Sequence, residues 1–465
     1  MMKIAQIKNE LLNWRELSPR KVVKYISFVI GAFILILALI FIFFPDPFIN
    51  TFLKDRITKV LKESYQAYSI KFSDMHYNFW KNRLGCDSIT LRTNDSTITC
   101  SAASFSVSGI GWIKILLQND YTSNILTSSV IDAQKIEINF HKSQYKLRFG
   151  MLHISVPDSG MTADSIKYNS LIGEEQFFAK SKIRQTRFRF DIPKIKIIGL
   201  DYLSLLQGNI YKARSIIIHD LFTDIFVNMD KPYDNNSPNP QMLNEALSSM
   251  KETVKVDSLK VINGWLNYRE RFALNTKPGV VTFNKVNVSI SGIANNTAHP
   301  DTTIIHGEGL FMNSGTMKLF MAIPPTSTDF SLRYSGSLST MDVTVLNSFI
   351  EPCEHKRIKS GILQSATYNI NVNSGHANGT LRAAYRDLSV AVLNKNTGSE
   401  NGIFDRISSI FSKIFIIRRT NMPDKKGLMK IGEIKYTRHP KDYFFNFLWF
   451  ALRNGIADVI GLPKI

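Results

Sequence analysis

Residues 187–197 read RFRFDIPKIKI, and this stretch decides the fold class of the chain. Apolar and charged side chains alternate in it, which is the period of a strand with one apolar and one polar face. The same alternation returns along most of the chain, and we therefore predict a mostly β protein built around an elongated antiparallel meander. The apolar members are Phe188, Phe190 and Ile192; Ile136, Ile138 and Phe140; Ile195 and Ile197; Ile225, Val227 and Met229; Val286, Val288 and Ile290; Met317, Leu319, Met321 and Ile323; and Tyr368, Ile370 and Val372.

Helical patterns are few between these stretches, which favours an antiparallel meander over βαβ units. An Asp-Ser pair followed by an apolar residue opens three of the expected strands, at Asp87, Asp164 and Asp257. We interpret this echo as a sign of related β-units, with chance similarity between short strand openings as the alternative. Turn signals separate many of the strands, namely Thr93-Asn94-Asp95, Asn263-Gly264 and Asn378-Gly379.

The run from Tyr25 to Phe44 (YISFVIGAFILILALIFIFF) is uncharged and apolar. As a helix it is about 30 Å long, which matches the hydrocarbon core of a bilayer. It is longer than the apolar part of a signal peptide, and no small-residue cleavage site is visible. Lys and Arg dominate residues 1–24, so the positive-inside rule keeps the N-terminus in the cytoplasm. We predict a single-pass inner-membrane protein, anchored between Tyr25 and Phe44, with its bulk in the periplasm.

Composition and hydropathy divide the chain into successive regions. Residues 45–68 have the pattern of an amphipathic helix, which either lies on the membrane surface or packs against the first sheet. The aromatic segment 443–450 is too short to span a bilayer and suits a terminal helix in a groove mouth, a membrane interface or a plain core helix. The expected regions are a cytoplasmic basic segment (1–24), a transmembrane helix (25–44), the amphipathic helix (45–68), a first β-groove region (69–230), a linker with a short helix (231–251), a second β-groove region (252–392) and a C-terminal helical and aromatic segment (393–465) that opens on an apolar stripe from Ile403 to Phe415.

The charge balance predicts an anionic partner. Lys and Arg number 57 against 38 Asp and Glu, which gives a net charge of +19. Because the anchor places most of this charge outside the cytoplasm, a phospholipid surface is favoured over nucleic acid.

Motifs for catalysis are missing from the sequence. The histidines are scattered, and no HExxH, CxxC, Walker or G-x-S-x-G pattern occurs. Glu174-Glu175 is expected to lie in a solvated loop. We therefore expect no catalytic residue, no metal and no cofactor.

The cysteines permit a disulfide but do not require one. Cys86 and Cys100 flank the turn at residues 93–95, at nearly opposite positions of an expected hairpin. A cross-strand disulfide between them is possible in an oxidising compartment, and two free buried thiols are the alternative. Cys353 would then have no partner.

Several stretches together resemble the AsmA-like family of bacterial envelope proteins. After the anchor and the amphipathic helix, residues 70–91 read IKFSDMHYNFWKNRLGCDSITL, similar to the opening of that family. The likeness covers most of residues 25–392 as diffuse patterning. It implies a repeating β-groove and a part in phospholipid movement between membranes or in outer-membrane integrity, and no catalytic residue carries over. The other residues that carry it are Val256–Val261, Gly264, Tyr268, Glu270, Gly279–Val288, Gly361-Ile362-Leu363, Tyr368, Gly375, Gly379, Leu381 and Tyr385–Leu388.

A long meander with one apolar face must cover that face. A second packed layer would make a sandwich, whereas a curled sheet could form a trough filled by lipid tails. The anchor and the basic surplus favour the trough. We thus predict a non-enzymatic, membrane-anchored β-groove that shields phospholipid acyl chains, with envelope proteins as possible partners. The alternatives are an assembly scaffold with a dry sandwich and an envelope hydrolase. Lipid-contact candidates are Ile136, Ile138, Phe140, Phe188, Phe190, Ile195, Ile197, Ile225, Val227, Val286, Val288, Ile290, Tyr368 and Ile370.

Overall fold

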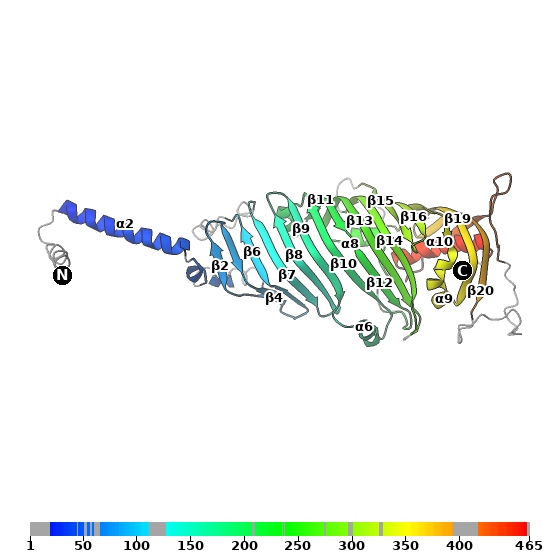
Figure 1. Ribbon diagram of the computed structural model, residues 1–465, viewed down its shortest axis with the longest axis horizontal. Helices are drawn as coiled ribbons and strands as arrows, with labels where there is room; N and C mark the ends of the chain where they lie inside the picture. Colours follow the sequence, from blue (N-terminus) through cyan, green and yellow to red (C-terminus); the bar gives the residue numbers. More distant parts are fainter. Residues whose placement is uncertain are drawn as a thin grey trace.

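One long sheet dominates the protein. The computed structural model describes residues 19–43, 45–50, 54–55, 58–59, 66–110, 127–206, 210–234, 236, 238–273, 276–295, 301–324, 329–393 and 417–462. Within these ranges 21 strands belong to a single sheet. Figure 1 shows them side by side in one long row, with helix α2 beyond its N-terminal end. The sheet is mixed but mostly antiparallel, which confirms the prediction of a mostly β protein.

The first strands are short and the later ones are long. In the first half they are β1 (Tyr68–Phe72), β2 (Met75–Asn78), β3 (Arg83–Cys86), β4 (Ile89–Thr93), β5 (Ile98–Ala102), β6 (Ser104–Ser108), β7 (Val130–Phe140), β8 (Tyr145–Ser155), β9 (Gly160–Ser170), β10 (Gln185–Ile198), β11 (Ile210–His219) and β12 (Phe222–Asn228). In the second half they are β13 (Thr253–Arg271), β14 (Gly279–Ala294), β15 (Thr303–Phe311), β16 (Gly315–Ile323), β17 (Leu332–Leu338), β18 (Met341–Asp342), β19 (Lys356–Asn373), β20 (His376–Val392) and β21 (Ile431–Thr437).

The pairing of the strands gives the order of the sheet. Two half-width ladders, β2–β3–β6 and β1–β4–β5, merge on β7, which pairs with β6 along its first half and with β5 along its second. From there β8, β9 and β10 follow by hairpins. Strands β11 and β12 both pair with β10 and together make the next row. Beyond β13 the ladder continues through β14, β15, β16, β17, β19, β20 and β21, with β18 beside β19.

One junction in the sheet is parallel, which corrects the expectation of a purely antiparallel meander. Strands β11 and β12 run in the same direction as β13, with Ala213 opposite Val256 and Phe226 opposite Arg269. A parallel pair needs a long crossover connection. Residues 229–252 supply it and contain helix α8 (Leu243–Ser249), so the proline-rich stretch with its short helix is the crossover that joins the two halves of one sheet.

Helix α2 (Pro19–Phe43) ends just before Pro45, whose ring and missing N–H disfavour a helix interior. Its described Phe, Ile, Leu and Val side chains, Phe28 and Phe33 among them, are exposed. Taken over the described residues, no helix has both the length and the apolar sequence to cross a membrane. The side chain of Tyr25 and the whole of Phe44 lie outside those residues.

The remaining helices are short, except for the last. Residues 51–53, 56–57 and 60–65 of the expected amphipathic helix at 45–68 lie outside the described residues, and so does the apolar stripe from Ile403 to Phe415. The C-terminal region contains a strand, β21, that the sequence reading did not foresee. The helices are α3 (Asp46–Phe48), α6 (Glu174–Lys180), α7 (Tyr202–Leu206), α8, the 3₁₀ helix η3 (Val343–Leu346), α9 (Asn347–Glu354) and α10 (Phe444–Ile460).

Two of the three predicted turns are not turns. The Thr93-Asn94-Asp95 turn joins β4 to β5 as expected. In contrast, Asn263-Gly264 lies within β13 and Asn378-Gly379 within β20. The Asp-Ser echo is also not structurally equivalent, since Asp164 and Asp257 lie inside β9 and β13 while Asp87 precedes β4.

The possible disulfide is not formed, and Cys86 and Cys100 are free thiols, the alternative that the sequence left open. Cys86 lies in β3 opposite Phe105, whereas Cys100 lies in β5 opposite Leu91 and Ile138. The two cysteines therefore belong to different half-width ladders and not to one hairpin. Burial raises the pKa of both thiols.

Candidate functional site: the apolar face of the sheet

All the lipid-contact candidates lie on one face of the sheet. We call it the apolar face, defined by Phe190 and Ile197, and the opposite one the polar face, defined by Arg189 and Lys196. The register carries the apolar face from strand to strand: Phe190 is opposite Tyr168, and Ile197 is opposite Ile216. In the second half of the sheet, Leu332 opposite Val372 and Ile434 opposite Gly379 continue the same face.

A row of irregular residues crosses the middle of the sheet and keeps this face in phase. Lys135, Ser165, Asp220, Asn263 and Lys285 all have positive φ, between 48° and 57°. They lie on or between neighbouring strands, from β7 to β14. In a regular strand, one extra residue would place every later side chain on the opposite face of the sheet. An irregular residue absorbs the extra position, so that the later apolar side chains remain on the apolar face.

The spacing of the apolar side chains shows the effect of this row. Ala133 and Ile136 are three residues apart in β7, and both belong to the same buried cluster. Ile192 and Ile195 have the same spacing in β10, opposite Ile166 and Ala163 of β9. Because bulges also bend strands and increase their twist, the row curves the sheet about a line across its strands.

Side chains of neighbouring strands satisfy the backbone along this row. The Asp164 carboxylate accepts a hydrogen bond from the Met151 amide at 3.1 Å. The Asn287 side chain accepts one from the Asn263 amide at 3.1 Å, and the Asn263 side chain donates one to Asp220 at 2.5 Å. In the sequence, each of these irregular positions is marked by a polar residue inside an alternating run. Such a residue is easily mistaken for a turn.

The side chains in the middle of the apolar face are only partly buried. Side chains such as Ile195, Ile225 and Ile290 are only half-buried, and Phe188 is 37% exposed. Among the described residues they belong to no cluster of fully buried side chains. Apolar side chains in register from β10 to β14 thus keep contact with the surroundings of the protein.

Helix α10 covers the C-terminal end of the same face. Figure 1 shows it behind the last strands. Ile370 is 0% exposed and packs in the largest buried cluster together with Phe447 and Val459 of the helix. Tyr368 is buried in that cluster as well, so the structure places these two lipid-contact candidates in a dry core and not on the accessible part of the face.

Glycines permit the close approach of α10. A Cβ on Gly432 of β21 would lie 2.3 Å from the Gly455 carbonyl oxygen, and one on Gly455 would lie 2.6 Å from Ile434. The helix is further held by Tyr334, whose hydroxyl donates to the Leu448 carbonyl at 3.2 Å. One side of the aromatic segment, with Phe444 and Phe447, thus packs into the core at the end of the apolar face, whereas Phe445 and Trp449 are exposed.

A buried ionic network lies at one edge of the sheet, beside α6. Arg269 of β13 donates to Asp224 and to Glu174, with N–O distances of 2.6 and 2.8 Å. Arg187 also reaches Glu174, at 3.2 Å. Arg271, only 4% exposed, pairs with Glu175 at 2.7 Å. Glu174 and Glu175 are therefore anchors of α6 and not members of the solvated loop that the sequence suggested.

A second polar cluster lies under α9 at the edge of the apolar face. The Tyr268 hydroxyl donates to Glu270 at 2.9 Å. Burial raises the pKa of Glu270 although the hydrogen bond from Tyr268 opposes the shift, and burial raises the pKa of Cys353 to about 12. A thiol with such a pKa is a poor nucleophile at neutral pH.

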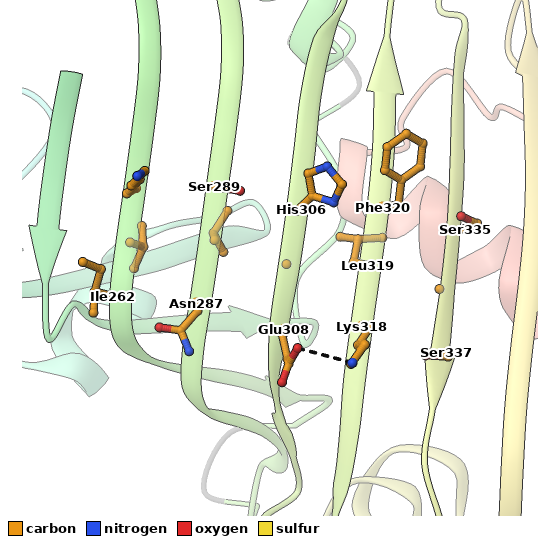
Figure 2. A pocket seen from close by; sticks show the side chains of 15 residues that line it. Ile262, Asn287, Ser289, His306, Glu308, Lys318, Leu319, Phe320, Ser335 and Ser337 are labelled. Atoms are coloured by element: carbon orange, nitrogen blue, oxygen red, sulfur yellow. Dashed lines mark ion pairs between the residues drawn. The ribbon is translucent and has the colours of Figure 1, made fainter. Parts of the chain in front are cut away.

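The polar face carries a shallow hollow. Figure 2 shows it crossing β13 to β17, with Glu308 and Lys318 paired beside it. Its lining mixes polar side chains with apolar ones such as Ile262 and Phe320, and it lies on the opposite side of the sheet from α10. The described residues contain no group of His, Cys, Asp and Glu side chains that could hold a metal ion.

Comparison with known proteins adds no identity to this geometry. No protein-family model matches the chain, and no curated protein matches it.

Proposed function

We propose that the apolar face holds the acyl chains of phospholipids, in a membrane-anchored periplasmic protein that supports lipid transport or outer-membrane homeostasis. The observation that carries this proposal is the accessible apolar surface from β10 to β14. Phe188 remains 37% exposed on a face that α10 seals completely at Ile370. A face made for a dry core would be covered along its whole length.

The binding mechanism needs no specific side-chain chemistry. Each methylene removed from water contributes about 0.8 kcal/mol, so an acyl chain is held without a fixed position along the sheet. The face has apolar side chains in register across many strands, and this continuity would let a chain move from strand to strand. Direction would come from a gradient or from an energised partner, because the surface itself is passive.

The N-terminal helix supports the membrane part of the proposal. Its exposed side chains, such as Phe28, Phe33 and Leu37, have no protein partner among the described residues. A helix that is apolar all round is stable only in a protein core or in a bilayer. The basic residues before it favour an N-terminus in the cytoplasm, and the resemblance to the AsmA-like family points to the same inner-membrane location.

Lipid analysis of the purified full-length chain tests the proposal. We expect phospholipids to co-purify with the wild type after gentle extraction, as measured by mass spectrometry. Ile197→Asp should lower the lipid content while the melting temperature stays near that of the wild type, because the site is accessible. Lys196→Asp, on the polar face of the same strand, is the matched control and should retain lipid.

An assembly scaffold is the second candidate, and the dry core under α10 favours it for the C-terminal end of the sheet. If the whole apolar face were buried in the native protein, Ile197→Asp would unfold the protein, as core substitutions with a charge do. Absence of bound phospholipid from the wild type would also refute the carrier.

A further inference from the structure

A shallow channel of about 580 Å³ crosses five strands on the polar face. Figure 2 shows its two walls, one on each side of a floor of strand backbone. One wall is formed by Lys260, Ser289, His306, Phe320 and Ser335, and the other by Ile262, Asn287, Glu308, Lys318 and Ser337.

The walls are straight because their members are direct cross-strand neighbours. Ser289 is opposite His306, and Phe320 is opposite both His306 and Ser335. Five strands at about 4.8 Å spacing give a length of about 19 Å, and wall residues two apart on a strand give a width of about 7 Å between Cα positions. The channel therefore fits one extended chain that runs perpendicular to the strands.

Some hydrogen-bonding groups in the walls are not used by the protein, whereas Asn287, Glu308 and Lys318 have protein partners. Among the described residues, the side chains of Ser289, Ser335 and Ser337 form no hydrogen bond, and Lys260 forms no ion pair. Each hydroxyl can both donate and accept, so the walls suit a ligand that also carries both kinds of group.

An aromatic ring lies in one wall. Phe320 packs against the His306 ring at 5.2 Å between centroids, and the Arg333 guanidinium carbon lies 5.7 Å from the Phe320 centroid. These neighbours fix the ring, which remains partly exposed. A fixed aromatic beside hydroxyl groups is the combination that recognises a sugar ring, whose C–H face is apolar and whose edge carries hydroxyls.

We propose that this channel binds a single uncharged glycan chain laid across β13 to β17. An α-helix, about 10 Å across with its side chains, is too wide. The charges do not suit a polyanion, because Glu308 lies 3.7 Å from Lys318 and Lys260 is the other lysine of the walls, while the nearby Arg333 guanidinium lies over the Phe320 ring. An extended peptide would pair best with a strand edge, where backbone groups are free, and these strands are paired on both sides.

Calorimetric titration with tetra-N-acetylchitotetraose, a neutral tetrasaccharide, tests the proposal on the full-length chain in a detergent without a sugar headgroup. We expect saturable binding that Phe320→Ala weakens about tenfold and Ser289→Val about fivefold, the loss for one hydrogen bond. Asn371→Val, an exposed polar-face change in β19 outside the channel, is the matched control and should bind like the wild type.

Three results would overturn the glycan site: no heat of binding, equal losses for Ser289→Val and Asn371→Val, or binding of a neutral Gly-Ser peptide in place of the sugar. Thermal unfolding of each variant separates lost binding from lost fold. Phospholipid content measured in the same preparations should not change, so failure here is independent of the proposed lipid function.

Discussion

Asp224 and Arg269 face each other from β12 and β13, and the carboxylate accepts two hydrogen bonds from the guanidinium, at 2.8 Å from Nε and 2.6 Å from Nη2. Asp224 is buried, and the Arg269 guanidinium lies 4.2 Å from the centre of the Phe226 ring. The pair belongs to the parallel junction, where β12 meets β13. An ion pair thus joins the two halves of the sheet at the place where their strands run side by side.

Removing one partner of this pair should destabilise the protein strongly. Arg269→Met leaves the buried Asp224 without its main counter-charge, which typically costs about 3–5 kcal/mol. Urea unfolding followed by circular dichroism would measure the loss. The control is Lys435→Gln in the exposed Lys435–Glu433 pair, where we expect less than about 1 kcal/mol. Similar small losses for both variants would contradict a buried network.

The Glu270 carboxyl should make stability depend on pH. Burial raises its pKa in the folded protein, so the folded state retains a proton that the unfolded state releases above about pH 4.3. Its contribution is complete below that pH and is lost as the pH rises through the folded pKa. Glu270→Gln cannot ionise and should therefore raise the melting temperature at pH 8 more than at pH 4. An equal change at both pH values would refute this assignment.

The contact between Gly432 and Gly455 should control the seating of α10. Gly455→Leu must push the helix away from Ile434, since even a Cβ there would lie 2.6 Å from that side chain. Overpacking of this kind costs about 1–3 kcal/mol. Hydrogen exchange should become faster in α10 and β21 only. Gly173→Ala has open space around the added methyl and serves as the control that should leave exchange unchanged.

Lys135 offers a test of the irregular row. In a regular strand, valine is favoured over lysine, but Lys135 has φ of +48°, where a β-branched residue is strained. Lys135→Val should therefore destabilise by about 1–2 kcal/mol, and Lys135→Gly should not. Lys196→Val, at an exposed position of β10, should cost little. A stabilising Lys135→Val would show that the residue is in ordinary strand conformation.

The Glu245 carboxylate makes a second pH test on the crossover. Burial favours its neutral form, but hydrogen bonds from Arg438 and from the Met242 amide outweigh this and lower the pKa. Its contribution is present above the unfolded value near 4.3 and is lost as the pH falls through the folded pKa. Glu245→Gln should lower the melting temperature at pH 7, and the difference from the wild type should shrink at acid pH. A difference that grows in acid would contradict this sign.

The strands and the composition of their faces were predictable because alternation is a local property. Phe188, Phe190 and Ile197 needed only their immediate neighbours to be assigned to one face. The pairing of Cys86 and Cys100 depended on register between strands, which the local pattern does not contain. Asn263-Gly264 was interpreted as a turn because Asn and Gly tolerate positive φ, and the structure uses that tolerance inside a strand.

The candidate site was predicted in part. The sequence identified its residues but not how exposed each of them is. Exposure depends on α10, which brings Phe447 against Ile370 although the two residues are far apart in the sequence. The ionic role of Glu174 and the channel beside Phe320 likewise arise from neighbours on other strands. The resemblance to the AsmA-like family stays a prediction.

The parallel junction has a consequence for the kinetics of assembly. Hairpins on either side of it form from residues close in sequence, whereas β13 can dock on β11 and β12 only after the loop 229–252 has closed. Closing such a loop costs entropy before any contact repays it, and contacts of high sequence separation slow folding. We expect amide hydrogens in the two halves to become protected from exchange early in folding, and the parallel junction to form last. The junction should therefore also be the first part of the sheet to separate during unfolding.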